Sequence, residues 1–402
     1  MARGNLDSFR RRLEEIQWDF ANVENSGIHL LHWYPATFVA AIPGSLVPIL
    51  TRKGGTVLDP FCGSGASGLE TVRLGRRFLG FDVNPVAILI TQAKLLMLDP
   101  SELVKLRRSV QDINKTLFVG RRRSGIEHPN REELARWYHP RTLEELLGIQ
   151  QVIEGLDDAA VRTVGRCLFS SILKTVCSQG KHWGWVCDNV APKPEEIQAK
   201  DAVAAFVAAL DIYVDGVTRL AKDMAVRGLD QRRLERGKDW DARCGDALAL
   251  MRDLPAGAVN SIITSPPYYG VADYVKSQRL TFLWFQNNVA TLGGCETGDF
   301  ESLRSLEIGS RSFRHRAESR SVYLSYFSEF FGEAERVLEV GGTLCLIVGE
   351  SSGRPETVQA LRERVMNRNL TEIFSSRRGI KATRRRISAR LPSENVLVYQ
   401  KS

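Results

Sequence analysis

Short apolar runs that each end at an acidic residue characterise the first part of the chain. The run at 56–58 leads into Asp59, and the run at 78–81 leads into Asp82. A glycine-rich turn and a helical stretch at about 66–74 separate the two runs. Apolar runs of this length with a helix between them predict two parallel strands in a βαβ unit.

A different periodicity governs the middle of the chain, residues 99–238. Apolar positions recur there at steps of three and four, which places them on one face of a helix. Strand signals are scarce, and the Pro-Lys-Pro segment at 192–194 marks a break, so the region is predicted to be nearly all helical. The clearest examples are Val161, Val164, Leu168 and Ile172, followed by Val203, Phe206, Val207, Leu210, Val214, Val217 and Leu220.

Strand patterns return after residue 238. Buried strands are predicted at 261–264 and 343–348, a helix is predicted to end near Val337, and 395–399 is predicted to form the final strand. The simplest assembly joins the first and last parts of the chain into one doubly wound α/β sheet that the helical region interrupts. The predicted organisation is a first sheet-forming segment at 1–98, a helical insertion at 99–238 and a second sheet-forming segment at 239–402.

Composition narrows the class of protein. The 402 residues are 43% hydrophobic and 25% charged, which is ordinary for a globular protein with a sizeable core. The formal net charge of +8 favours a polyanionic partner, above all nucleic acid, because lysine and arginine neutralise phosphates.

Cysteine and histidine spacing predicts no metal site. The seven cysteines include no close CxxC pair, and His139 and His182 have no partners at ligand-like spacing. The N-terminal segment MARGNLDSFRRRLEE has no apolar stretch typical of a signal peptide. A continuous apolar run of roughly 18 residues, as a membrane span needs, is also missing. We therefore expect no membrane span and a protein of the reducing cytoplasm.

The turn after the first strand has the sequence LDPFCGSG at 58–65. Glycines at such a turn let the backbone approach a ligand closely as it enters a helix. A glycine-rich turn without any ligand would have the same spacing, so the turn alone leaves both interpretations open. No lysine follows as in a P-loop, which argues against a nucleoside triphosphate.

Four segments together resemble one family. DPFCGSG at 59–65 resembles the DPFxGSG cofactor signature of amino-methylating DNA methyltransferases. HWYPATF at 32–38 resembles that family's HxYPAKF segment, with Thr37 where lysine is usual. GFDVNP at 80–85 resembles the second strand, whose acid accepts hydrogen bonds from the two ribose hydroxyls. CGDA at 244–247 resembles the end of the third strand, near the adenine of the cofactor.

This resemblance implies S-adenosyl-L-methionine as cofactor and a Rossmann-like methyltransferase fold. The implied sheet has seven mostly parallel strands and an antiparallel final strand, with the helical region inserted. Taken alone, Asp82 or Asp246 could instead cap a helix. The cofactor-binding residues implied by the matching segments are Tyr34, Pro35, Thr37, Phe38, Asp59, Phe61, Gly63, Gly65, Asp82, Val83, Asp246 and Ala247.

An apolar strand runs into a proline corner, IITSPPY at 262–268. Proline fixes φ and has no N–H donor, so such a corner is rigid and its carbonyls point outward. An exocyclic amine is a poor nucleophile because its lone pair is delocalised into the ring. If Ser265 Oγ and the Pro266 carbonyl accept its two N–H bonds, the lone pair turns toward the methyl donor.

The predicted catalytic residues are Ser265, Pro266, Pro267 and Tyr268, with Tyr268 stacking on a base that has been flipped out of the duplex. The alternative is a proline-rich turn with an exposed aromatic side chain.

The form of this corner bears on the target base. Ser-Pro-Pro-Tyr preceded by Thr264 resembles the version common in cytosine-N4 methyltransferases, whereas adenine-N6 enzymes more often carry Asp at the position of Ser265. Cytosine-C5 chemistry needs a cysteine beside a proline in this loop, and none occurs between Cys244 and Cys295. We therefore predict methylation of cytosine N4 in DNA. The alternatives are adenine-N6 methylation, methylation of RNA, and a non-catalytic DNA-binding protein with the same fold.

Basic residues are the candidates for contacts to DNA phosphates, with a solvated charged face as the alternative. The predicted contacts are Arg314, Arg378, Lys381, Arg384, Arg385 and Arg386.

The order of motifs in the family places target recognition in the insertion. Its aromatic pieces at 137–140 and 181–185 could stack on bases, but for most of these side chains we favour ordinary packing. The resemblance implies double-stranded DNA as partner and suggests a companion restriction or phage-defence protein.

Overall fold

The computed structural model describes residues 3–20, 23, 25, 27–35, 37, 39–113, 115, 126–178, 191–229, 234–285, 292, 299–349, 356–366, 368–380 and 393–402. All structural statements below concern these residues.

A seven-stranded sheet forms the centre of the molecule, in the order β3-β2-β1-β4-β5-β7-β6. Neighbouring strands from β3 to β5 are parallel, and β7 lies antiparallel between β5 and β6. This order confirms the predicted doubly wound, mostly parallel sheet with an antiparallel final strand. The strands are β1 (Thr56–Asp59), β2 (Arg77–Asp82), β3 (Trp240–Cys244), β4 (Val259–Thr264), β5 (Leu338–Gly349), β6 (Leu370–Gly379) and β7 (Ser393–Lys401).

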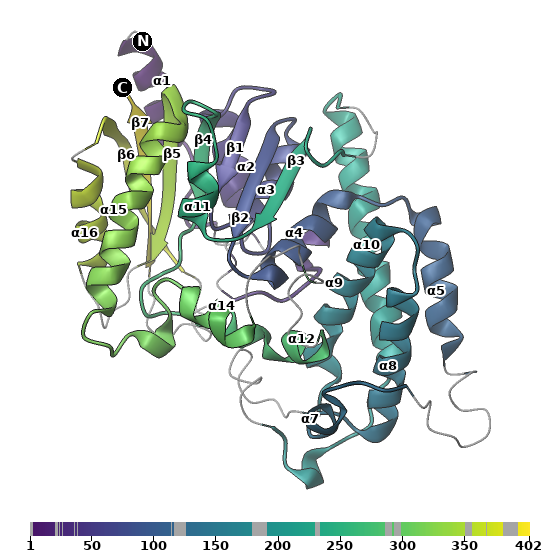
Figure 1. The fold of residues 1–402 in the computed structure, drawn as a ribbon. Coiled ribbons are helices and arrows are strands. Elements are labelled where there is room, and N and C mark those ends of the chain that lie inside the picture. Colours follow the sequence, from purple (N-terminus) through teal and green to yellow (C-terminus); the bar gives the residue numbers. More distant parts are fainter. Residues whose placement is uncertain are drawn as a thin grey trace.

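Helices cover both faces of the sheet (Figure 1). Successive residues of a strand point to opposite faces, and in β1 Val57 packs with α2 whereas Leu58 packs with α15. On the first face lie α1 (Arg3–Glu14), α2 (Ala41–Leu50), α3 (Ala66–Arg73) and α4 (Pro85–Leu96). On the other lie α11 (Ala247–Arg252), α15 (Ser319–Val337) and α16 (Thr357–Met366).

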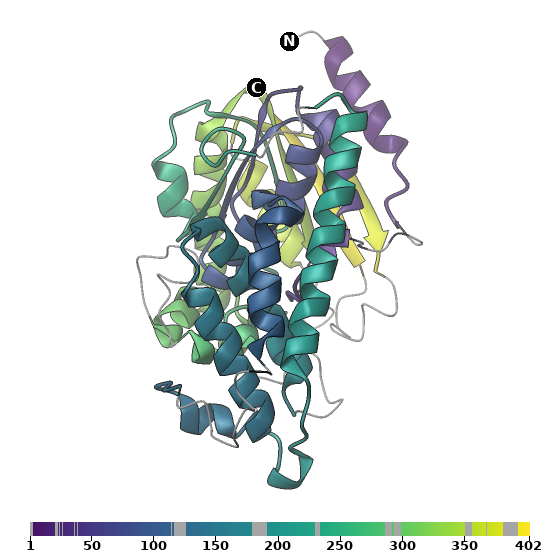
Figure 2. The ribbon, with the colours of Figure 1, turned by 90° about the vertical axis from the view of Figure 1, so that its right-hand side faces the viewer.

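The residues between α4 and β3 form a helical block beside the sheet (Figures 1 and 2). One hydrophobic cluster runs without interruption from Phe78 in β2 to Leu168 and Phe206 in the block, so the block shares a core with the sheet. The helices of the block are α5 (Val104–Gln111), α7 (Arg131–Ala135), α8 (Pro140–Glu154), α9 (Ala159–Val176) and α10 (Ala202–Val226). Two further helices follow β4 in the chain, α12 (Arg279–Trp284) and α14 (Phe300–Leu306).

The aromatic side chains of the block that the structure describes are packing residues. Trp137 and Tyr138 are fully buried, and Trp284 packs edge-on against Tyr138. This confirms the preference for ordinary packing at these two positions. The second aromatic piece, 181–185, lies outside the described residues.

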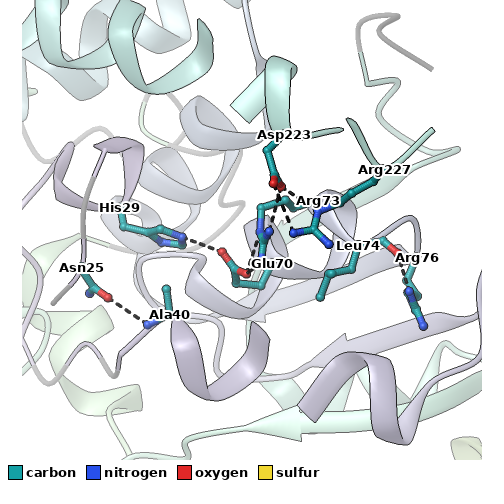
Figure 3. A network of polar contacts seen from close by, with 9 residues as sticks. All are labelled: Asn25, His29, Ala40, Glu70, Arg73, Leu74, Arg76, Asp223 and Arg227. Carbon is teal, nitrogen blue, oxygen red and sulfur yellow. Dashed lines mark hydrogen bonds and ion pairs between the residues drawn. The ribbon is translucent and has the colours of Figure 1, made fainter. Parts of the chain in front are cut away.

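A polar network, buried at Glu70 and open to solvent at Asp223 and Arg227, attaches the helical block to the glycine-turn helix (Figure 3). Glu70 of α3 accepts a hydrogen bond from Arg73 at 2.6 Å and lies 3.0 Å from the imidazole of His29, which is in a short 3₁₀ turn (Gly27–Leu30). Arg73 also pairs with Asp223 of α10 at 2.8 Å, and Arg227 pairs with the same carboxylate. The network therefore holds the N-terminal segment, α3 and α10 together.

No helix in the described parts of the chain is both long and apolar enough to cross a bilayer.

Candidate functional site

The site lies where β1 and β4 end side by side. At this point the strand order reverses, with β2 and β3 on one side and β5 on the other, and ligands of open α/β sheets bind in the crevice at such a switch point. The glycine turn follows β1, and the proline corner follows β4. The fold thus brings the two sequence motifs to one edge of the sheet.

The glycines of the turn have conformations that other residues rarely adopt. Gly63 has φ of 50° and Gly65 has φ of 73°. A Cβ on Gly65 would lie 2.6 Å from Thr91 Oγ1, so the close approach of α3 and α4 requires glycine there. A Cβ on Gly63 would lie 3.3 Å from the ring of Tyr34 and would narrow the space between them. The turn therefore packs closely against the Tyr34 ring at Gly63.

Asp82, at the end of β2, is fixed by the same turn. Its Oδ2 accepts a hydrogen bond from the Gly63 N–H at 2.9 Å, and its Oδ1 accepts one from the Asn84 N–H at 2.9 Å. Burial raises the pKa of Asp82 to about 6, although both backbone donors favour the charged form. Each carboxylate oxygen keeps a second lone pair, so the side chain can still accept hydrogen bonds from a ligand.

A single pocket connects the turn to the corner. Of the residues predicted from the sequence, it is lined by Tyr34, Pro35, Thr37, Phe61, Gly63, Asp82, Val83, Asp246, Ala247, Ser265 and Pro267. Residues that the sequence interpretation missed also line it: Pro60, Cys62, Ser64, Ala66, Asn84, Tyr274, Leu306, Glu307, Ile308 and Tyr326. Pro60, Cys62, Ser64 and Asn84 stand within the quoted motifs and Ala66 follows one of them, whereas Tyr274, Tyr326 and the 306–308 segment lie outside the motifs.

An aromatic wall closes one end of the pocket. Phe61 packs against Phe330 and Phe327, with ring centroids 5.5 and 5.9 Å away. Next to it, Asp246 caps α11 through the Ala249 N–H and accepts a hydrogen bond from Tyr326 at 2.9 Å. Asp246 is therefore both a helix cap and a pocket residue, so the two interpretations of this aspartate are compatible.

The proline corner orients Ser265 through a relay of hydroxyl groups. Ser265 Oγ donates to the Tyr268 hydroxyl at 3.0 Å, and that hydroxyl donates to Glu394 of β7 at 3.0 Å. Because the serine proton is directed at Tyr268, the lone pairs of Ser265 Oγ remain available to accept hydrogen bonds in the pocket. Glu394 belongs to no sequence motif. The pairing of β7 with β5 brings it next to the proline corner.

Four of the predicted site residues do not line the pocket. Asp59 is completely buried, and it accepts hydrogen bonds from Thr264 Oγ1 at 2.6 Å, from the Phe61 N–H and from Ser67. It therefore ties the two loops together rather than facing the cofactor position, and burial raises its pKa to about 6. Gly65, Pro266 and Tyr268 also lie outside the lining, and Phe38 lies outside the described residues.

Of the predicted DNA contacts, the structure describes Arg314 and Arg378. Arg314 is half-buried and donates to the Arg311 carbonyl at 2.6 Å. Arg378 is only 4% exposed and lies 3.3 Å from the carboxylate of Glu394. A guanidinium that contacts phosphate must reach the surface, so this placement contradicts the prediction for Arg378. Lys381, Arg384, Arg385 and Arg386 lie outside the described residues.

The strand order and the pocket define the class. A doubly wound sheet with an antiparallel strand inserted before its edge, and an acid at the end of β2 facing a glycine turn, make this a Rossmann-like methyltransferase fold. Residues 10–93 match a family model described as DNA methylase.

Curated relatives agree with this family model. The chain is 30% identical over 106 residues to the type II methyltransferase M.XycI of Xanthomonas campestris pv. cyanopsidis, and 31% identical over 106 residues to M.Cfr9I of Citrobacter freundii. Each alignment covers 26% of this chain and 24% of the relative. M.MvaI of Kocuria varians is 23% identical over 188 residues, which are 44% of this chain and 40% of the relative.

Within this class, the matched segments of the chain are similar to amino-methylating DNA methyltransferases. The matched segments span about a quarter of the first two relatives. The activity of the whole protein is therefore a proposal, argued below.

Members of this family use S-adenosyl-L-methionine, and the pocket fits that group. The pocket runs along Tyr34 and Gly63, the oriented carboxylate of Asp82 and the aromatic wall at Phe61, which suit an amino acid, a ribose and an adenine in one elongated ligand.

Proposed function

We propose that this protein transfers a methyl group from S-adenosyl-L-methionine to the exocyclic N4 of a flipped cytosine in double-stranded DNA. One observation carries the proposal. Ser265, held as an acceptor by Tyr268 and Glu394, lines the same pocket as Asp82 and Asp246. A nucleobase amine at the corner would therefore meet a cofactor held by the glycine turn.

The protein residues hold and orient the cofactor. Asp82 would accept hydrogen bonds from the ribose hydroxyls, and Asp246 with Ala247 would face the adenine edge beside Phe61. Tyr34 and Thr37 would flank the methionine end, where Thr37 Oγ1 donates to the Tyr34 carbonyl at 3.0 Å. When bound, the cofactor supplies a methyl group on a sulfonium, which needs positioning rather than activation.

The proline corner would orient the exocyclic amine for methyl transfer. Ser265 Oγ and the Pro266 carbonyl would accept the two N–H bonds, so that the nitrogen lone pair leaves the plane of the ring and points at the methyl group. After transfer the nitrogen is positively charged, and it releases one of these two protons to solvent water. The base has to leave the duplex because its amino nitrogen is inaccessible in the stack.

The position of Tyr268 changes its expected contribution. Its ring is 4% exposed and its hydroxyl is engaged on both sides, so in this structure it orients Ser265. Stacking on the flipped base stays a prediction for the DNA-bound state.

The choice of cytosine rests on the form of the corner. Thr-Ser-Pro-Pro-Tyr at 264–268 resembles the cytosine-N4 version of the motif. The pocket itself fits either amino-bearing base, so adenine N6 is the second candidate.

Sequence recognition is assigned to the insertion, 99–238. It shares a core with the cofactor helix and is tied to it through Arg73 and Asp223, so it would present a fixed surface to DNA beside the site. A companion restriction or phage-defence protein is part of the same proposal, by analogy with the relatives.

The test incubates the full-length protein and labelled S-adenosyl-L-methionine with plasmid DNA, with structured RNA, or with no nucleic acid. The products are digested to nucleosides and separated by mass spectrometry. N4-methyldeoxycytidine is the expected product, and N6-methyldeoxyadenosine would reassign the base. A methylated ribonucleoside alone would reassign the substrate to RNA. Tight cofactor binding without any product would point to a non-catalytic protein.

A further inference from the structure

The carboxyl group of Glu307 lies in the pocket, although Glu307 belongs to none of the sequence motifs. The segment Leu306-Glu307-Ile308 lines the pocket together with Ser265 and Tyr274, and Glu307 is 8% exposed. The segment begins at the last residue of α14 and lies along the loop that continues from the proline corner. Its carboxyl group therefore shares a pocket with Ser265, the residue to which the amine of the target base is assigned.

The backbone of the segment is firmly held against that loop. Gly270 donates to the Gly309 carbonyl at 2.8 Å, and Arg311 donates to the Ala272 carbonyl at 3.1 Å. Asp273 accepts hydrogen bonds from Ser310 Oγ and from the Ser312 N–H at 2.8 Å. The position of Glu307 is therefore fixed relative to Ser265 by the same loop.

The surroundings of Glu307 favour its neutral form. Its Oε1 accepts a hydrogen bond from the Tyr274 N–H, and no salt bridge to it occurs among the described residues. Burial raises its pKa to about 8, and the nearby Asp273 acts in the same direction; together they outweigh the backbone N–H groups of Tyr274 and Val275 and the charge of Arg304, which favour the charged form. The other ionisable groups around it are Tyr34, Tyr274 and Arg304, and Arg304 is paired with Glu301 at 3.0 Å.

A neutral carboxylic acid can tell cytosine and adenine from guanine and thymine. Its O–H is a donor. Cytosine has an acceptor nitrogen, N3, next to the carbon that carries the amine, and adenine has N1 in the same relation. Guanine and thymine carry an N–H at the equivalent ring nitrogen. The O–H of the carboxylic acid would therefore face a second donor and could not form a hydrogen bond. The amine itself is proposed to donate to Ser265 and Pro266. The adjacent ring nitrogen therefore still needs a hydrogen-bond donor.

We propose that Glu307 is a specificity-determining residue whose carboxylic acid donates a hydrogen bond to the ring nitrogen beside the target amine. This inference rests on the proposed function, and it names the group that recognises the flipped base within that site.

The experiment compares the wild type with Glu307→Gln and Glu307→Met across pH 6.5 to 9.5, by measuring kcat/KM for DNA. The wild type should lose activity as the pH rises through about 8, because the carboxylate has no O–H to donate. Glu307→Gln keeps an N–H donor at every pH, so its activity should stay level over the same range. Glu307→Met has no donor and should be slower by roughly 10- to 100-fold throughout.

Two controls make the outcome decisive. The Kd for S-adenosyl-L-methionine and the Tm should be unchanged in both variants. A wild-type alkaline limb that persists in Glu307→Gln would overturn the inference, and so would a large loss of cofactor affinity, which would assign Glu307 to the ammonium of the cofactor. In either case the wild type would still methylate DNA, whereas a wild type without any methylation would overturn the proposed function itself.

Discussion

Thr264 and Asp59 are 205 positions apart in the sequence, and Thr264 Oγ1 donates a hydrogen bond to Asp59 Oδ1 at 2.6 Å. Thr264 is the last residue of β4 and precedes the proline corner, whereas Asp59 is the last residue of β1 and begins the glycine turn. Both side chains are completely buried. This bond fixes the distance between the loop assigned to the methyl donor and the loop assigned to the amine.

Thr264→Val should destabilise the protein by about 1–3 kcal/mol, because it removes a donor from a buried carboxylate while keeping the shape of the side chain. Thr264→Ser is the matched control, since it retains the hydroxyl. Urea unfolding of both variants measures the difference. A Thr264→Val protein as stable as Thr264→Ser would show that the bond does not contribute.

Ser265→Ala should reduce kcat by roughly 100-fold, because an oriented hydrogen-bonding group of an active site typically contributes that much. The Kd for S-adenosyl-L-methionine should stay the same, since Ser265 is assigned to the base. Single-turnover methylation and calorimetry measure the two quantities. Equal losses of both would show that the serine belongs to the cofactor site instead.

Tyr268→Phe tests the hydroxyl relay by itself. The substitution leaves the ring in place but removes the acceptor of the Ser265 proton and the bond to Glu394. We expect a smaller loss of kcat than for Ser265→Ala, because Ser265 Oγ remains but can rotate. Combining the two substitutions should add little to Ser265→Ala alone, since they act through one group. An additive double variant would mean that Tyr268 acts independently, for example by stacking.

Cofactor affinity should fall as the pH drops through about 6. The ribose hydroxyls need the ionised form of Asp82, and burial raises its pKa to that value from an ordinary value near 3.8. The affinity is therefore full above pH 7 and decreases as the carboxylate gains a proton. Calorimetric titrations with S-adenosyl-L-methionine between pH 5 and 8 measure this.

Asp82→Asn is the control for this pH dependence. It should weaken binding at pH 8 by roughly 10- to 100-fold, the usual range for losing hydrogen bonds to a charged group, and should remove most of the pH dependence. A pH profile parallel to that of the wild type would assign the titration to another group, of which buried Asp59 is the nearest candidate.

Gly216→Ala should destabilise the attachment of α10. A Cβ there would lie 2.7 Å from the backbone nitrogen of Ile28, so the helix must move away from the N-terminal segment. Overpacking of this kind costs about 1–3 kcal/mol. In an exposed helix the same change would stabilise the protein by up to about 1 kcal/mol. A rise in the Tm would therefore contradict the close contact.

The amino-acid sequence by itself determined the sheet class, the helical character of the insertion and the two loops of the site. These features depend on local periodicity and on glycine and proline, whose backbone preferences act over a few residues. The pocket position of Asp82, Asp246 and Ser265 follows from this, because parallel strands place their carboxyl ends at the same edge.

Only the tertiary structure decided which polar groups meet. Asp59 binds Thr264 instead of lining the pocket, Arg378 is buried beside Glu394, and Glu394 accepts a hydrogen bond from the proline corner. Glu307 likewise reaches the pocket from a segment without any motif. Each of these contacts joins residues far apart in the chain. Strand order and helix packing set such contacts, and neither is encoded in the pattern of neighbouring residues.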